Sequence, residues 1–143
     1  MQLLSDAVEL SGLKTDIPNP VLDIHCLSIE DISTINLNYL NHEGPTDVIS
    51  FSYEDDFLPG MTDYTLGEIF ICPEIAEKSA LELGCTVSEE LIYYIVHGIL
   101  HLAGYDDHNK NDIIEMRNAE KHLLDELSKS YNLTEQCEIK ESS

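Results

Sequence analysis

The chain has 143 residues, which is the size of a single domain that buries a sizeable core. It carries 28 acidic residues against 7 basic ones, and the formal net charge of −21 argues against broad electrostatic capture of nucleic acid or of anionic membranes. No apolar run reaches the roughly 18 residues of a membrane span, and the first residues lack the basic start of a secretory signal, so we expect a cytoplasmic protein whose four cysteines are reduced.

The first half of the chain predicts two helices and two strands. Apolar residues recur at helical spacing over residues 2–11, and they alternate with polar residues over 21–27, as in a strand. Ser28 is a candidate N-cap for a helix that continues to about residue 39. The apolar set of this helix is Ile32, Ile35 and Leu37. After a loop, the β-branched and aromatic residues 48–53 predict a second strand.

A third strand and a third helix follow. The acidic residues 54–63 predict a turn region, and residues 65–72 predict the strand. Pro73 suits the first turn of a helix, and Gly84 is placed to end that helix.

Two further helices complete the predicted domain. Thr86 and Glu89 fit a capping box for a helix that continues to about residue 103. A last amphipathic helix covers about residues 111–128. Its apolar set is Ile113, Ile114, Met116, Leu123, Leu124 and Leu127. Residues 135–143 predict a frayed polar tail.

This order of elements favours an α/β fold. We expect a single-domain sandwich over residues 1–134, in which helices pack on a small mixed sheet. The hydrophobic pattern does not give the order of the strands.

The segment HGILHLAGYDDH, which begins at His97, has the pattern of a metal site. His97 and His101 stand four residues apart, so a helix places both imidazoles on one face, about 6 Å apart at Cβ. Gly104 allows the backbone a positive φ and therefore a turn back towards the helix. Asp107 and His108 follow this turn, and either side chain could complete a site with the two histidines.

The neighbours of the two histidines favour a metal site over an ordinary histidine pair. The predicted helix is nearly apolar all round, and burying two unpaired imidazoles there costs free energy. Two helical nitrogens and one ligand from the turn leave a coordination position open, as in catalytic zinc sites. Gly98 stands where the H-E-x-x-H proteases carry their glutamate base, which disfavours a zinc peptidase.

Three segments resemble motifs of the YbeY family. HGILHLAGYDDH is similar to the family signature H-G-x-L-H-L-x-G-Y-D-H, GPTDVISF resembles P-T-D-V-L-S-F, and LGEIFIC resembles an L-G-D-I strand. The matches keep the family order and run from about Tyr39 to His108. The resemblance implies an α/β fold with one zinc ion held by three histidines in a cleft, at the end of a central helix. It also implies a metal-dependent, single-strand-specific endoribonuclease that matures ribosomal RNA, especially at the 3′ end of 16S RNA, and that serves ribosome quality control.

The chain departs from the family pattern at two positions. The family's third histidine falls six residues after the second, where this chain has Asp107, and His108 comes one place later. A carboxylate is a competent zinc ligand, so the register favours Asp107, with His108 as the alternative. Leu40 stands where the family carries an arginine that is thought to act on the phosphate. His42 is a candidate to replace part of that role, or else an exposed loop histidine, and the predicted catalytic residues are His97 and His42.

A few basic residues near the metal motif are candidates for contacts with RNA. Lys110, Arg117 and Lys121 follow the motif closely and are predicted to bind phosphates, although a solvated helix face is the simpler explanation. The expected partners are ribosomal RNA in a pre-ribosomal particle and, with it, ribosomal proteins; neither DNA nor a membrane is expected. A non-catalytic, metal-binding factor of ribosome assembly is the main alternative, because of Leu40 and the acidic surface.

Overall fold

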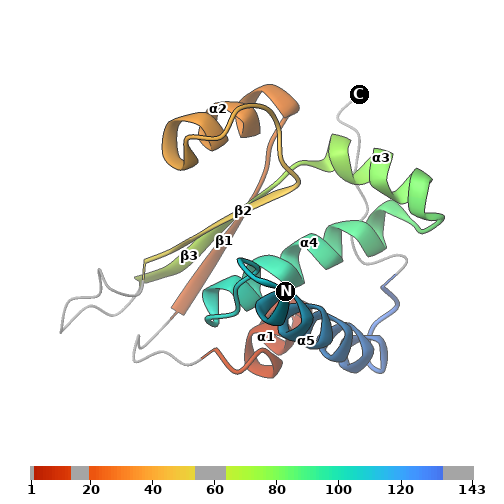
Figure 1. Ribbon diagram of the computed structural model, residues 1–143. Coiled ribbons are helices and arrows are strands. Elements are labelled where there is room, and N and C mark those ends of the chain that lie inside the picture. Colours follow the sequence, from red (N-terminus) through yellow and green to blue (C-terminus); the bar gives the residue numbers. More distant parts are fainter. Residues whose placement is uncertain (1, 14–19, 54–63, 134–143) are drawn as a thin grey trace.

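The computed structural model describes residues 2–13, 20–53 and 64–133 (Figure 1). In chain order its elements are α1 (Gln2–Leu10), β1 (Pro20–Cys26), α2 (Ile29–Leu40), β2 (Val48–Ser52), β3 (Tyr64–Ile71), α3 (Pro73–Leu83), α4 (Val87–Leu102) and α5 (Lys110–Ser128). The predicted helices and strands are therefore confirmed to within about one residue at their ends. The turn region expected at 54–63 and the tail expected at 135–143 lie outside the described residues.

The described strands form one mixed sheet with β3 at its centre. β3 runs parallel to β1 and antiparallel to β2, so the strand order is β1-β3-β2. Ile69 in the middle of β3 pairs with Ile24 on one side and with Ser50 on the other, and it is fully buried. The sheet confirms the α/β class and the small mixed sheet expected from the sequence.

Helices cover both faces of this sheet. Figure 1 shows α2 on one face and α4 on the other, with α1 and α5 packed beyond α4. Helix α4 is in contact with β2, β3, α1, α3 and α5, so it is the central helix of the fold. Its buried apolar side chains form much of the core, among them Leu91, Ile92, Val96, Ile99 and Leu100. Burial of these apolar side chains supplies most of the favourable free energy that stabilises the packing of the helices on the sheet.

Local signals fix the two ends of α4. The Thr86 hydroxyl accepts a hydrogen bond from the backbone N–H of Glu89, and the Glu89 carboxylate accepts one from the backbone N–H of Thr86. This is the predicted capping box. After the helix, Gly104 has a φ of +105°, which a residue with a side chain rarely adopts. The chain can therefore turn back along α4, as the glycine predicts.

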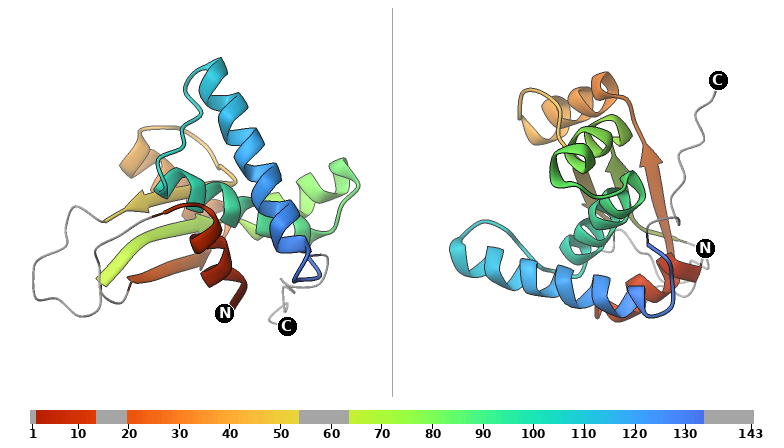
Figure 2. Two further views of the ribbon diagram at one scale, coloured as in Figure 1. Left: turned by 90° about the horizontal axis from the view of Figure 1, so that it is seen from below. Right: turned by 90° about the vertical axis from the view of Figure 1, so that its right-hand side faces the viewer.

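Three residues of the predicted apolar sets are exposed, which corrects the sequence analysis. Leu37, Ile113 and Ile114 are 50%, 41% and 58% exposed. Ile113 and Ile114 belong to the first turns of α5, and Figure 2 shows these turns projecting beyond α4. Leu37 lies on α2 away from Ile32, which packs on the sheet. The helical spacing of apolar residues predicts both helices correctly. It does not show which turns of each helix are covered by another part of the fold.

The described cysteines carry free thiols. Cys72 is buried, while Cys26 at the end of β1 is exposed. Cys137 lies outside the described residues. Across the described helices, each falls short of the length or of the apolar character that a membrane crossing requires.

Candidate metal centre

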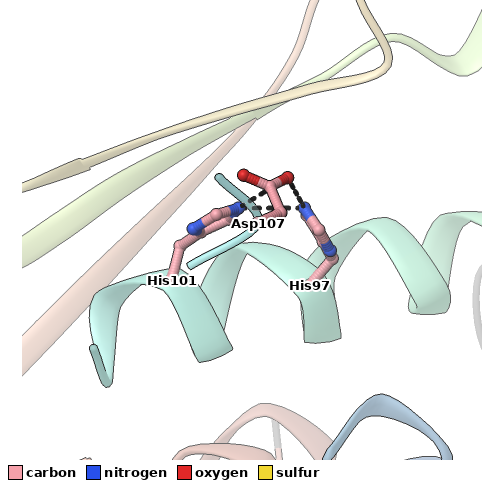
Figure 3. A group of neighbouring side chains, drawn as sticks. All are labelled: His97, His101 and Asp107. Atoms are coloured by element: carbon pink, nitrogen blue, oxygen red, sulfur yellow. Dashed lines mark hydrogen bonds and ion pairs between the residues drawn. The ribbon is translucent and has the colours of Figure 1, made fainter. Parts of the chain in front are cut away.

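Helix α4 presents His97 and His101 side by side. Their Nε2 atoms are 3.0 Å apart, and Figure 3 shows both rings on the same side of the helix. Most of the residues around them on the helix are buried, and the four-residue spacing places both side chains on one helix face. Burial, and next the neighbouring His97, lower the pKa of His101. Its imidazole is therefore neutral near pH 7, with a lone pair that can bind a metal.

The turn at Gly104 brings Asp107 to this histidine pair. Its Oδ2 atom lies 3.9 Å from Nε2 of His97 and 3.7 Å from Nε2 of His101 (Figure 3). With the 3.0 Å between the nitrogens, the three atoms lie on a circle of radius about 2.1 Å, which is the length of a zinc–nitrogen or zinc–oxygen bond. These three residues form a group whose donor types and spacing fit one metal ion.

A buried carboxylate holds His97 from behind. Nδ1 of His97 is 2.5 Å from Oε2 of Glu120 on α5, and Glu120 is only 2% exposed. The other carboxylate oxygen, Oε1, accepts hydrogen bonds from the hydroxyl of Tyr93 at 3.1 Å and from Nη1 of Arg117 at 2.9 Å. Arg117 also donates to the hydroxyl of Tyr93. A ligand histidine is commonly oriented by such a carboxylate behind it.

The pKa values in this network follow from its contacts. Burial would raise the pKa of Glu120, but the hydrogen bonds from His97 and Arg117 outweigh it, so this pKa lies below its ordinary value. The contact with Glu120 raises the pKa of Arg117. Burial, and then the charge of Glu120, raise the pKa of Tyr93, so its hydroxyl remains a hydrogen-bond donor.

Sequence reasoning did not identify Glu120 or Tyr93. One signal for Glu120 was present, because Glu120 follows Met116 by four residues and precedes Leu123 and Leu127 on the apolar face of α5. An acidic residue in that register either is exposed or has a buried partner. Tyr93 precedes His97 by one helical turn, and its ring stacks on the His97 ring with 6.2 Å between centroids.

The metal group opens onto a pocket of about 500 Å³. The opposite walls are the end of α2, the loop after it and the first residues of β2. The pocket is lined by Leu40, Thr46, Asp47, Val48, Ile49, Ser50, His97, His101, Asp106, Asp107 and His108. Neither lysine nor arginine is among these lining residues. Leu40, at the position where an arginine is expected in the family, is at the pocket wall.

The structure separates His108 and His42 from the histidine pair. His108 lines the pocket, but its side chain is 81% exposed and its Nε2 faces Oδ1 of Asp106 at 3.7 Å. The geometry therefore groups Asp107, not His108, with His97 and His101. His42 lies exposed in the loop after α2 and does not line the pocket.

The three basic residues predicted to bind RNA lie on α5 in different settings. Lys110 is the exposed first residue of the helix, and it follows the pocket residue His108 closely. Lys121 is exposed on a later turn. Arg117 is paired with Glu120, although its side chain remains 60% exposed. All three side chains are therefore exposed, and Arg117 differs from Lys110 and Lys121 in its pairing with buried Glu120.

Gly98 leaves no place for the glutamate base of an H-E-x-x-H peptidase. A Cβ atom at Gly98 would lie 2.9 Å from Cδ1 of Ile69, closer than real side chains allow. The position that carries the base in H-E-x-x-H proteases thus faces the sheet and has no room for a glutamate side chain.

A second set of metal-binding residue types lies outside this pocket. Asp23, His25 and Glu68 come from β1 and β3 and lie close together. His25 stacks on Phe70, and Tyr53 donates to Glu68 at 2.8 Å. These contacts place His25 and Glu68 among aromatic side chains of the sheet.

Comparison with known proteins connects this site to one family. The family model described as Endoribonuclease YbeY matches residues 1–128. A protein named Endoribonuclease YbeY from Protochlamydia amoebophila is 39% identical over 108 residues, which cover 76% of this chain and 71% of that protein. Proteins of the same name from Finegoldia magna and Corynebacterium efficiens are each 36% identical. Their matches cover 76% and 86% of this chain, and 70% and 66% of those proteins.

A solved structure shares the fold. The solution structure of TM1509 from Thermotoga maritima superposes with a TM-score of 0.61 at 26% sequence identity. The match covers 99% of this chain and 87% of that one.

Proposed function

Because the chain belongs to the YbeY endoribonuclease family, we propose that it is a zinc-dependent endoribonuclease that hydrolyses phosphodiester bonds in single-stranded RNA. Its substrate is ribosomal RNA near the 3′ end of 16S RNA, met in a pre-ribosomal particle in the cytoplasm, and the same cleavage serves ribosome quality control. The observation that carries the proposal is the group of His97, His101 and Asp107 on the wall of an open pocket.

The three residues of this group would hold one zinc ion. When bound, the ion supplies a water of near-neutral pKa and polarises a phosphoryl oxygen. His97 and His101 bind from a rigid helix, while Asp107 comes from an exposed loop, so the substrate side of the group stays accessible. Thr46 and Ser50 line the facing wall, and their hydroxyls would orient the RNA backbone.

The surroundings of the pocket favour a flexible strand brought by a larger particle. A net charge of −21 repels a polyanion at long range, and the pocket wall has no lysine or arginine to offset that repulsion. Lys110 and Lys121 on α5 are the cations that we assign to phosphate contacts. The pre-ribosomal particle, with its ribosomal proteins, then supplies most of the binding free energy.

One observation favours a second candidate function. Leu40 lines the pocket in the place of a phosphate-binding arginine, and exposed His42 does not reach the pocket lining. A protein that binds metal and a ribosomal particle without cleaving RNA would tolerate this loss. A non-catalytic assembly factor is therefore the alternative that the decisive experiment has to exclude.

The experiment compares cleavage of single-stranded and structured RNA of the same sequence. We expect the zinc-loaded protein to cut the single strand, to lose this activity with chelator, and to recover it when zinc is restored. His101→Ala is the matched inactive variant, because it removes one ligand of the group. RNA that stays intact with fully loaded protein, both as naked RNA and in a pre-ribosomal particle, would support the assembly factor instead.

A further inference from the structure

Glu120 contacts His97 but lies outside the group of candidate ligands. We propose that Glu120, held by Arg117 and Tyr93, is a positioning residue that fixes which ring nitrogen of His97 faces the metal. The inference rests on the metal-dependent function proposed above, but it concerns the proton on His97 and not the cleavage step. It also gives Arg117 a role other than the RNA contact predicted from the sequence.

The two nitrogens of His97 face different partners. Nδ1 is 2.5 Å from the Glu120 carboxylate, while Nε2 is 3.0 Å from Nε2 of His101 and faces Asp107. A neutral imidazole carries one proton, on one nitrogen only. With the proton on Nδ1, the ring donates to Glu120 and leaves the lone pair of Nε2 in the metal group. The opposite tautomer would set a lone pair against the carboxylate and point a proton at the metal position.

Glu120 can do this only if its own position is fixed. The residue is 2% exposed, and a buried carboxylate is costly unless donors surround it. Tyr93 and Arg117 both donate to Oε1, which leaves Oε2 for His97. Tyr93 comes from α4 and Arg117 from α5, so the carboxylate is held from both helices.

Arg117 acts on the metal through Glu120 in this arrangement. It is the single arginine in the sequence, and its Nη1 atom is engaged with Glu120 and Tyr93 instead of facing the pocket. It does not line the pocket that would receive RNA. Removing Arg117 should therefore weaken metal binding, and the loss should depend on the carboxylate at position 120.

The test measures zinc affinity by competition with a chromophoric chelator. Glu120→Gln keeps the shape of the side chain and removes its charge, so we expect zinc to bind roughly tenfold or more weakly. Arg117→Ala should cause a smaller loss in the wild-type background and no further loss in the Glu120→Gln background. Glu115→Gln is the matched control, because it makes the same change at an exposed position on the same helix. It should leave zinc affinity unchanged.

A second readout does not need zinc. Long-range ¹⁵N–¹H spectra of the zinc-free protein at mildly alkaline pH show which nitrogen of His97 carries the proton. We expect the Nδ1–H form in the wild type and a mixture of tautomers in Glu120→Gln. Thermal unfolding of each variant separates this effect from a general loss of structure.

The outcomes distinguish two failures. If wild-type protein binds zinc tightly and Glu120→Gln binds it equally well, with the same tautomer, the positioning role is wrong and the proposed function stands. If wild-type protein binds no zinc, the metal-dependent function fails, while the spectra of the zinc-free protein still decide the role of Glu120. If Arg117→Ala lowers zinc affinity as much in the Glu120→Gln background as in the wild type, Arg117 does not act through Glu120.

Discussion

Gly98 of α4 lies directly against Ile69 of β3. A Cβ atom added to Gly98 would stand 2.9 Å from Cδ1 and 3.0 Å from Cγ2 of Ile69. The missing side chain therefore lets the central helix approach the central strand closely. Because His97 is the preceding residue, this contact also sets where the metal ligands stand relative to the sheet.

We expect Gly98→Ala to destabilise the protein by about 1–3 kcal/mol, since the extra methyl group overpacks a buried contact. Thermal unfolding should show a fall in midpoint of several degrees. Adding Ile69→Val removes the nearest atom and should restore part of the loss. A Gly98→Ala variant as stable as the wild type would mean that α4 and β3 can separate at little cost.

Zinc affinity should distinguish Asp107 from His108. We expect Asp107→Ala to weaken zinc binding by roughly tenfold or more, because it removes a donor from the group. His108→Ala should change it little, since this exposed side chain faces Asp106. The opposite ranking would assign the third ligand to His108 and require the turn to shift by one residue.

Features of this site that depend on neighbouring residues could be predicted from the sequence, whereas contacts between distant segments could not. His97, His101 and Gly104 were readable because a helical turn and a positive φ are local properties of the chain. Glu120 was missed because it acts across two helices, at a separation of 23 residues. Charge on a predicted amphipathic helix is normally read as a solvent face, and only the packing of α5 on α4 shows otherwise.

The same distinction applies to the fold. Thr86, Glu89 and Gly84 gave helix ends correctly, because caps depend on neighbouring backbone atoms. The strand order was not available, since the parallel pairing of β1 with β3 joins segments far apart in the chain. Ile113 is likewise exposed because α4 ends before it can cover the first turns of α5. The sequence pattern within α5 does not indicate where α4 ends.

Leu40→Arg should restore a cation to the pocket wall. If the protein cleaves RNA, we expect the variant to cut roughly tenfold faster or more, because a positive group near the phosphate stabilises the developing charge. Leu37→Arg makes the same charge change on the same helix without lining the pocket. Equal rates for both variants would show that net charge, and not the position of the arginine, is what matters.

Salt dependence should reveal how few phosphates the protein contacts. We expect a shallow slope that corresponds to about two or three contacts, at roughly 0.7 per phosphate for single strands. Lys110→Ala and Lys121→Ala should each lower it, while Lys78→Ala on α3 serves as the control. If RNA affinity depends steeply on salt and neither substitution changes that slope, the phosphate contacts lie elsewhere.

Glu90 gives a pH dependence of stability with a definite sign. This residue of α4 is 8% exposed, and burial, together with the charge of Asp47, raises its pKa above the ordinary 4.5. The folded protein therefore binds the proton more tightly than the unfolded chain, and stability falls as the pH rises through the folded pKa.

Glu90→Gln should accordingly unfold at higher urea concentration than the wild type at pH 7. The difference should vanish below about pH 4.5, where both states of the wild type are protonated. Glu82→Gln, exposed on α3, should show no such trend. A constant difference at all pH values would trace the effect to packing.

The unequal anchoring of the three candidate ligands has a consequence for how fast a bound metal would exchange. His97 and His101 sit on the most enclosed helix, whereas the side chain of Asp107 is 48% exposed on a loop. Loops open more readily than core helices. Release of a bound ion should therefore start with dissociation of the Asp107 carboxylate from the ion. We therefore expect Asp107 to govern the residence time of the ion and the histidine pair to govern its capture. Stopped-flow transfer of zinc to excess chelator should speed up in Asp107→Ala, with the association rate nearly unchanged.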